Sequence, residues 1–408
     1  MSDGCKPKFD AGRRPTAAGG RGASPNFALS PAGLDSEGIA RFLVSTGVAR
    51  DAAVGWAVRT SGGWVLGAGR ASVEGPLELE PVFDLASVTK PMTAFAVARS
   101  RRLARTDRLG DVLDEARGTA SAASPLELLL AHRAGLEAHL PLFEAAVTGS
   151  IDRGAALRTA AAARRADAGG RIVAEGFAPV YSDLGYLLAG EALARAEQAP
   201  DAGEVIERLV VNALGRDDLG TARTLAARGS VDFARRARPT EVVAFRGGEI
   251  RGVVHDENAW ALTGAGGSGH AGMFGTAAAV LAFGCAAFDA IERGEGPLVP
   301  DALEARDLGW LVRPRPGGTL RAGFDGKSDS GSSAGACAGP RTFGHLGFTG
   351  TSLWIDPDAH AVVTVLTNRV HPTRDNVAIR AARPVVHDAL FALAREAREA
   401  SERSERGR

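Results

Sequence analysis

This 408-residue sequence has few cysteines, few aromatic residues and no formal net charge. Its three cysteines, Cys5, Cys285 and Cys337, are too few for a disulfide scaffold and have no metal-ligand spacing. Lys plus Arg and Asp plus Glu each number 48, so the formal net charge is zero. This balance gives no electrostatic reason to expect nucleic acid as a partner. Aromatic residues make up only 6%, so the interior must rely on Ala, Val and Leu.

Long apolar runs are missing as well. No stretch approaches the roughly 18 consecutive apolar residues of a membrane span, so we expect no such span. Residues 1–30 lack the apolar segment of a secretory signal. We therefore expect a cytoplasmic protein whose thiols are unpaired.

The chain divides into one folded region between two polar ends. Residues 1–35 are rich in Gly, Pro and Arg, which predicts a disordered segment. Residues 399–408 form a charged tail, expected as a frayed continuation of a C-terminal helix. The folded domain between them is expected to span 36–398. Its sheet part covers about 36–100 and 300–398, and a helical insertion covers about 101–299.

Local patterns support this division. Two β-type runs, 53–58 and 64–67, surround a Gly turn and predict a hairpin. Strand character returns at 343–355 and 361–367, on either side of a turn. Helices are expected from Ser87 to about Leu103, from a capping box at 124–127 with Pro125 as first helical residue, and over 376–394 with a break near Pro384. Residues 316–340 are a loop by composition, and we expect this loop to lie over a cleft.

The sharpest local signal is Ser87-Val88-Thr89-Lys90 at the start of a helix. Positions i and i+3 share a helical face, so the Lys90 amine can approach the Ser87 hydroxyl. A buried lysine could take the serine proton and make the oxygen nucleophilic. An N-cap serine followed by a surface lysine would give the same four residues, so this motif alone decides nothing.

A second motif, Tyr181-Ser182-Asp183, opens an apolar helix. A buried tyrosine near a lysine can have a lowered pKa and act as a general base. Asp183 fits helix capping and active-site duty equally well.

The third motif is 344–352, with His345, Gly347 and Phe348 on a predicted strand. Glycines within a strand mark a bulge or a close backbone approach. The N–H of Phe348 could then serve as an oxyanion donor beside that of Ser87. Packing of the sheet against a helix would explain the same glycines.

The order of these motifs resembles the serine β-lactamase and penicillin-recognising superfamily, specifically its class C β-lactamase-like hydrolases and esterases. The resemblance covers about residues 39–387 and is supported by flanking phrases at 83–86, 129–136, 269–274 and 349–357. It implies an α/β (α+β) fold in which both chain ends form a β-lactamase/transpeptidase-like sheet domain with an inserted helical domain. The site would lie between the two parts.

The resemblance also implies residue roles. Ser87 would be the acylated nucleophile, Lys90 its proton partner and Tyr181 the general base. His345-Leu346-Gly347 would stand in the place of the family's Lys-Thr-Gly. Neither a cofactor nor a metal is implied.

Two departures from the family pattern bear on the substrate. The family's β-lactamases have Asn where Asp183 stands and a cationic Lys where His345 stands. Losing that cation should weaken recognition of a substrate carboxylate, although histidine can be partly charged near pH 7. Asp183 would further disfavour an anionic substrate and favour a protonated Lys90. Both changes favour neutral esters or amides.

Three other patterns are weaker. Residues 331–335 match G-x-S-x-G but lack the strand before and the helix after that a nucleophile elbow requires. His255-Asp256-Glu257-Asn258 has no zinc spacing and is expected to be a loop of capping side chains. His270 could line the cleft or be a buried, satisfied histidine.

We therefore expect a serine hydrolase acting through an acyl-enzyme on a small-molecule ester, amide or β-lactam, with an esterase favoured and no protein partner evident. A β-lactamase or D-alanyl-D-alanine carboxypeptidase is the first alternative. A non-catalytic ligand-sensing protein of the same fold is the second.

Overall fold

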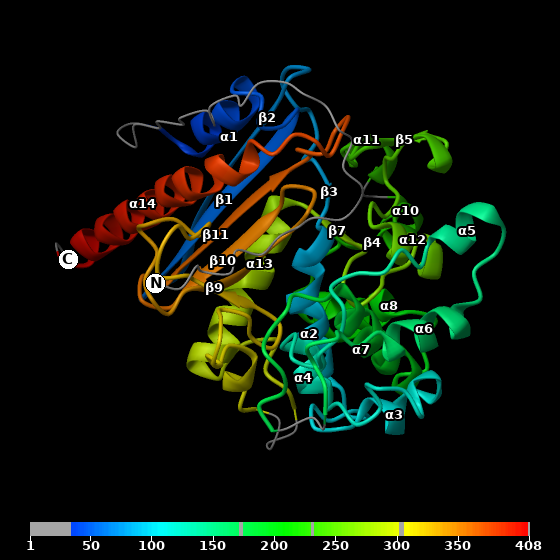
Figure 1. Cartoon of the computed structure of the whole chain (residues 1–408). Coiled ribbons are helices and arrows are strands. Elements are labelled where there is room, and N and C mark those ends of the chain that lie inside the picture. Colours follow the sequence, from blue (N-terminus) through cyan, green and yellow to red (C-terminus); the bar gives the residue numbers. More distant parts are fainter. Residues whose placement is uncertain (1–33, 171–173, 230–231, 302–305, 407–408) are drawn as a thin grey trace.

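The computed structural model describes residues 34–170, 174–229, 232–301 and 306–406 (Figure 1). Nearly all of the expected disordered segment, 1–35, and the end of the charged tail lie outside these ranges. The strands are β1 (Asp51–Thr60), β2 (Gly63–Ser72), β3 (Phe83–Asp84), β4 (Leu219–Thr221), β5 (Val242–Val243), β6 (Gly248–Glu249), β7 (Met273–Gly275), β8 (Asp325–Gly326), β9 (Phe343–Leu346), β10 (Ser352–Asp356) and β11 (Ala361–Thr367). The α-helices are α1 (Ser36–Ser45), α2 (Thr89–Arg99), α3 (Leu109–Val112), α4 (Leu126–Leu130), α5 (Glu144–Thr148), α6 (Arg153–Ala162), α7 (Asp183–Ala196), α8 (Ala202–Ile206), α9 (Asn212–Leu214), α10 (Ala222–Ala227), α11 (Phe233–Arg236), α12 (Glu257–Thr263), α13 (Ala277–Phe288) and α14 (Ile379–Arg406).

An antiparallel sheet in the order β2-β1-β11-β10-β9-β8 is built from both ends of the chain. The predicted hairpin is confirmed, since β1 and β2 pair from Asp51–Ser72 to Thr60–Gly63. The pairing of β1 with β11 brings the two chain ends into one sheet. The expected fold class, a mixed α/β sheet domain with a helical part between its two halves, is therefore confirmed.

Side chains alternate between the two faces of this sheet. In β11, Ala361, Val363 and Val365 pack into the core beneath α1 and α14, whereas Val362 and Leu366 pack into the core that contains α13 and the central helices. This period of two is the pattern expected for a strand covered on both faces. Figure 1 shows α1 and α14 along one face of the sheet and α13 along the other. Thus α13, which lies within the range assigned to the helical insertion, packs on the sheet.

A small sheet in the order β3-β7-β4 was not anticipated from the sequence, which reads as helical and irregular between residues 124 and 288. Its strands are only two or three residues long, too short to show any alternation. The sheet is important for the site because β3 leads directly through the short helix η1 (Ala86–Val88) into α2.

Three expected helix boundaries differ in the structure. Helix α2 ends at Arg99 instead of near Leu103 because Ser100 has extended backbone angles. The capping box at 124–127 is wrong: Pro125 is the extended residue before α4, and the Glu127 carboxylate is taken by Arg105 and Arg315.

The break expected near Pro384 is also wrong. Helix α14 runs through Pro384 to Arg406, so the C-terminal stretch expected to fray is helical as far as Arg406. A proline removes one backbone hydrogen bond from a helix. Val386, Leu390 and Ala394 of α14 are buried in the core between this helix and the sheet. Their packing stabilises the helix in spite of the lost hydrogen bond.

The 316–340 segment is held at two places. Residues 332–339 contact α14, where the Cys337 N–H donates to Asp388 and the Ser333 carbonyl accepts from His387. Gly317 and Gly318 lie against the Pro179 ring, two residues before Tyr181. Residues 331–335 have no flanking strand and helix, which agrees with the rejection of a nucleophile elbow there.

Candidate active site

Ser87 is presented by the tight connection between β3 and α2. Ala86 has a φ of 47°, a left-handed conformation that is uncommon for a residue with a Cβ. Its N–H donates to Asp84 Oδ1 at 2.8 Å, and the other oxygen of this buried carboxylate accepts from the His255 N–H at 2.7 Å. The turn therefore places Ser87, half-buried, within the short helix η1, two residues before α2 begins.

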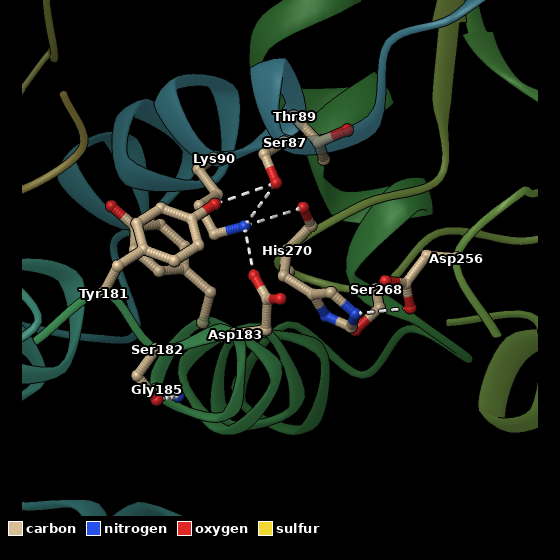
Figure 2. A network of polar contacts seen from close by, with 12 residues as sticks. Ser87, Thr89, Lys90, Tyr181, Ser182, Asp183, Gly185, Asp256, Ser268 and His270 are labelled. Carbon is tan, nitrogen blue, oxygen red and sulfur yellow. Dashed lines mark hydrogen bonds and ion pairs between the residues drawn. The ribbon is translucent and has the colours of Figure 1, made fainter. Parts of the chain in front are cut away.

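Lys90 is fully buried directly behind Ser87. Its Nζ lies 2.8 Å from Ser87 Oγ, 2.7 Å from Asp183 Oδ1 and 3.2 Å from the His270 carbonyl oxygen (Figure 2). The approach of Lys90 to Ser87 predicted from the i, i+3 spacing is therefore present. An N-cap serine with a surface lysine is not what the structure contains.

Tyr181 reaches Ser87 from the other side. Its hydroxyl donates to Ser87 Oγ at 2.9 Å, and both Tyr181 and Lys90 point toward that oxygen in Figure 2. Ser182 caps α7 by accepting from the Gly185 N–H, which leaves Asp183, the first helical residue, to pair with Lys90. Of the two roles considered for Asp183, helix capping is performed by Ser182, and Asp183 itself contacts Lys90.

Burial shifts the pKa values of Lys90 and Tyr181 in opposite directions. It lowers the pKa of Lys90 below its ordinary value, and the Asp183 carboxylate opposes that shift without reversing it. Burial, together with the Asp183 charge, raises the pKa of Tyr181 well above 10. The expectation of a lowered tyrosine pKa is therefore wrong: the cation that should lower it is paired with a carboxylate, and the phenol stays protonated.

His345 is a buried, neutral residue of β9. Burial and the nearby Lys90 charge lower its pKa to about 3. Its Nδ1 lies 2.8 Å from the Leu346 carbonyl oxygen, which can only accept, so Nδ1 carries the hydrogen and Nε2 is left as an acceptor. The partial positive charge allowed for this histidine near pH 7 is therefore absent. Its ring centre lies 6.0 Å from that of Tyr181.

Gly347 and Phe348 begin a tight turn after β9, spanning residues 347–351. The Gly347 N–H donates to the Thr351 carbonyl at 2.8 Å, and a Cβ on Gly347 would overlap the Thr351 hydroxyl. The hydroxyls of Thr349 and Thr351 donate to the carbonyls of Asp84 and Leu85, at 2.8 and 2.9 Å. These bonds tie the turn to the segment that immediately precedes Ser87.

His270 is buried and both of its ring nitrogens have hydrogen-bond partners, which was one of the two possibilities considered for it. Figure 2 shows its carbonyl facing Lys90 while its ring turns away. The ring bonds Asp256 Oδ1 at 2.8 Å and Ser268 Oγ at 3.0 Å. Asp256 also caps α12 through the Ala259 N–H, as expected for a capping side chain, whereas Glu257 and Asn258 belong to the helix instead of a loop.

Sequence reasoning missed three residues around the site. His132 stacks on the Tyr181 ring with centroids 4.7 Å apart, and its Nδ1 accepts from the Ser182 N–H. Arg369 and Arg383 bond to carbonyls of the 347–351 turn. His132 lies within the flanking phrase 129–136 and could have been singled out there. The arginines gave no local signal, because each follows the turn by about 20 residues or more.

A family model described as Beta-lactamase matches residues 43–387, which is most of the chain. The chain belongs to the Beta-lactamase family. It is thus a serine hydrolase of the β-lactamase fold. Among the described residues, no helix combines the length and the apolar character needed to cross a membrane.

Curated relatives match over a short stretch only. A protein of Salmonella agona (strain SL483), named as a D-alanyl-D-alanine carboxypeptidase, is 33% identical over 129 residues. That stretch is 31% of this chain and 29% of the relative, so less than a third of the relative's length is matched.

Solved structures are similar over nearly the whole chain at low identity. EstCE1, a hydrolase with promiscuous acyltransferase activity, has a TM-score of 0.60 and 21% identity, over 87% of this chain and 97% of that chain. A class C β-lactamase from Rhodobacter sphaeroides has a TM-score of 0.58 and 15% identity, over 87% and 98%. A penicillin-binding protein homologue from Caulobacter crescentus has a TM-score of 0.58 and 20% identity, over 88% and 98%. At these identities the likeness is one of fold.

Proposed function

We propose that this β-lactamase-family hydrolase cleaves esters or amides through an acyl-enzyme on Ser87, and that uncharged esters are its preferred substrates. The observation that carries the proposal is the double contact at one oxygen: Ser87 Oγ lies within hydrogen-bond distance of both Lys90 Nζ and Tyr181 OH. A serine oxygen between a base and an acid is the arrangement that nucleophilic catalysis requires.

The acylation step follows from the two pKa shifts. Lys90 in its amine form takes the proton of Ser87 as Oγ bonds to the substrate carbonyl carbon. The resulting oxyanion accepts hydrogen bonds from the N–H groups of Ser87 and Phe348. When the carbon–oxygen bond to the alcohol breaks, the protonated Tyr181 gives its proton to the departing oxygen. It regains one from Lys90, since both groups lie within hydrogen-bond distance of the same Ser87 oxygen.

Deacylation repeats these transfers with water. Water gives its proton to Lys90 by way of Tyr181 and attacks the acyl carbon. The Ser87–acyl bond then breaks, and Ser87 Oγ takes the proton back from Lys90. The acid is released and the three side chains return to their starting states.

The charges around the site support a neutral substrate. His345 is uncharged at neutral pH, so it supplies no cation for a substrate carboxylate. The Asp183 carboxylate lies 2.7 Å from Lys90 Nζ and would repel an anionic ligand nearby. His345 Nε2, as an acceptor, suits a substrate hydroxyl or amide N–H.

A β-lactamase or D-alanyl-D-alanine carboxypeptidase is the second candidate. It is favoured by the name of the Salmonella agona relative and by the class C β-lactamase among the similar folds. Both substrate classes carry a carboxylate, so the state of His345 separates this candidate from the esterase.

Paired assays on the purified full chain test the proposal. Hydrolysis of p-nitrophenyl butyrate is compared with that of a chromogenic cephalosporin and of a peptide ending in D-Ala-D-Ala. We expect kcat/KM for the ester to be at least ~100-fold higher than for the cephalosporin or the peptide. This ratio corresponds to about 3 kcal/mol, the contribution of one charge-assisted hydrogen bond to the substrate carboxylate, which neutral His345 does not make. Efficient cephalosporin or peptide turnover would replace the esterase proposal with the second candidate. No turnover of any substrate would favour a ligand-sensing protein.

A further inference from the structure

The turn 347–351 is held from behind by two buried arginines. Arg383, from α14, donates through Nη2 to the carbonyls of Gly347 and Thr351, at 2.8 and 2.9 Å. Arg369 donates through Nε to the Phe348 carbonyl at 2.9 Å. Both residues are more than 90% buried.

These two guanidinium groups have no acidic partner within ion-pair distance, and among the described residues the buried Arg133 and Arg321 share this property. Within the described part of the chain, neither Arg369 nor Arg383 forms an ion pair. By contrast, the fully buried Arg315 pairs with Glu127, and Arg374 pairs with Glu241 and Glu257. Burial and repulsion by neighbouring arginines lower the pKa of Arg383 to about 9 and that of Arg369 to about 10, so both stay charged at pH 7. A buried charge without a counter-charge is costly unless another interaction compensates it.

The position of Arg383 suggests what that interaction is. The Gly347 carbonyl and the Phe348 N–H belong to the same trans peptide group and point in opposite directions. Because Arg383 bonds the carbonyl, the N–H faces away from the guanidinium. A charged donor on the carbonyl polarises the amide and strengthens the hydrogen bond that its N–H can donate.

The turn is also fixed on the side of the nucleophile. Thr349 and Thr351 bond to the carbonyls of Asp84 and Leu85, so the peptide cannot rotate without breaking contacts to the strand before Ser87. The guanidinium, the peptide and the Ser87 segment thus form one connected unit.

We propose that Arg383, supported by Arg369, is a positioning residue that polarises the Gly347–Phe348 peptide and places positive charge behind the oxyanion site. This inference rests on the proposed acyl transfer at Ser87. It locates a group that is cationic at neutral pH on the protein side of the peptide, although β9 presents the neutral His345. Such a cation stabilises the negative charge of the tetrahedral intermediate without offering a contact to a substrate carboxylate.

Three variants separate charge from packing. Arg383→Met removes the charge and the donors, Arg383→Gln keeps neutral donors, and Arg383→Lys keeps the charge. The matched control is Arg395→Met, which removes an exposed cation from the same helix, about three turns away from Arg383. The thermal midpoint of each variant is recorded so that only folded proteins are compared.

We expect kcat for p-nitrophenyl butyrate to fall by ~10-fold or more in the Met and Gln variants, with KM changed less than ~2-fold, as for a lost oxyanion-site interaction. The Lys variant should keep most of the wild-type kcat, and Arg395→Met should match the wild type. A second readout is inhibition by phenylboronic acid, whose anionic tetrahedral adduct on Ser87 mimics the intermediate. Its Ki should rise in parallel with the loss of kcat.

Two outcomes would overturn the inference. One is a kcat and boronate Ki unchanged in Arg383→Met. The other is an Arg383→Lys variant as defective as the neutral ones, which would make the role one of shape. If Arg383→Met does not fold, the comparison of the Gln and Lys variants carries the test alone. Absence of ester turnover in the wild-type protein would instead contradict the proposed function, so the two failures are distinguishable.

Discussion

Lys90 Nζ lies 2.7 Å from Asp183 Oδ1, and this pair sets the balance of charge behind the nucleophile. Burial favours the neutral amine of Lys90, whereas the carboxylate favours the ammonium. The proposed mechanism needs the amine, so activity should rise with pH through the lowered pKa of Lys90. A fall is expected as pH rises through about 9, where Arg383 loses its charge; Tyr181 causes no earlier fall, because its pKa is raised well above 10.

Asp183→Asn should move this acidic limb to lower pH. Without the carboxylate the ammonium loses its counter-charge, the pKa of Lys90 falls further, and more enzyme is in the amine form at pH 6. The expected displacement of the limb is roughly one to three pH units. The measurement is kcat/KM for p-nitrophenyl butyrate between pH 5 and 10. Asp167→Asn, which removes a surface carboxylate paired with Arg165, is the control and should leave the profile unchanged. An acidic limb at the same or a higher pH in Asp183→Asn would contradict Lys90 as the base.

His345→Lys should convert part of the ester specificity into recognition of a carboxylate. The introduced ammonium replaces a neutral ring and can form a charge-assisted hydrogen bond, so cephalosporin kcat/KM should rise by ~10-fold. His345→Gln, a neutral variant of similar length, is the matched control. Equal cephalosporin turnover in the two variants would mean that the charge at this position does not decide the substrate.

Gly347→Ala should disable the turn that carries Phe348. A Cβ there would overlap the Thr351 hydroxyl and approach the Leu85 carbonyl oxygen to 2.7 Å, so the turn must move away from the Ser87 segment. We expect kcat to fall by ~10²-fold, as for the loss of an oxyanion donor, with a cost in unfolding free energy of about 1–3 kcal/mol from overpacking. Gly169→Ala, at an open surface position, should have neither effect. Wild-type kcat in Gly347→Ala would remove Phe348 from the proposed oxyanion site.

Much of the site could be predicted because its chemistry is local in sequence. Ser87 and Lys90 share one helical turn, so their spacing indicated that these two side chains could meet. That Tyr181 joins them was implied by the resemblance to the serine β-lactamase superfamily. What could not be predicted depends on contacts between distant segments. The pKa of Tyr181 is raised because of burial that only the packed helices create. Arg383 reaches the 347–351 turn across a helix–sheet interface, which no spacing rule indicates.

In the fold, too, the elements with local sequence signals were predicted, and those that depend on contacts between distant segments were not. The hairpin of β1 and β2 and the strands β10 and β11 were visible as alternating or apolar runs beside turn residues. The β3-β7-β4 sheet was missed because its pairings, such as Phe83 with Gly275, join short segments almost 200 residues apart. Pro384 was expected to interrupt a helix that is instead continuous, because the packing of α14 on the sheet stabilises it.

Buried His387 should make the protein sensitive to mild acid. Its Nδ1 donates to the Ser333 carbonyl and its Nε2 accepts from the Ser352 hydroxyl, and burial lowers its pKa to about 3. The unfolded chain binds a proton near pH 6.5 and the folded chain does not, so stability is complete above that pH and is lost as pH falls toward 3. When the pH falls from 8 to 5, protonation of His387 in the unfolded chain should lower the free energy of unfolding by about 2 kcal/mol.

Urea unfolding of the wild type and of His387→Gln at the two pH values measures this contribution. The variant should lose less stability on acidification than the wild type, and its value at pH 8 corrects for any packing defect. Equal losses in the two proteins would show that His387 does not titrate on unfolding in this range.

The central claim is that Ser87 becomes acylated, and covalent labelling tests it most directly. The wild-type chain and Ser87→Ala are treated with an alkyl fluorophosphonate, digested and analysed by peptide mass spectrometry, with p-nitrophenyl butyrate turnover followed in parallel. The account predicts one phosphonate on the peptide containing Ser87, loss of turnover in proportion to labelling, and neither labelling nor turnover in the variant. A label on another serine, such as Ser268 or Ser333, or turnover that survives in Ser87→Ala, would contradict it.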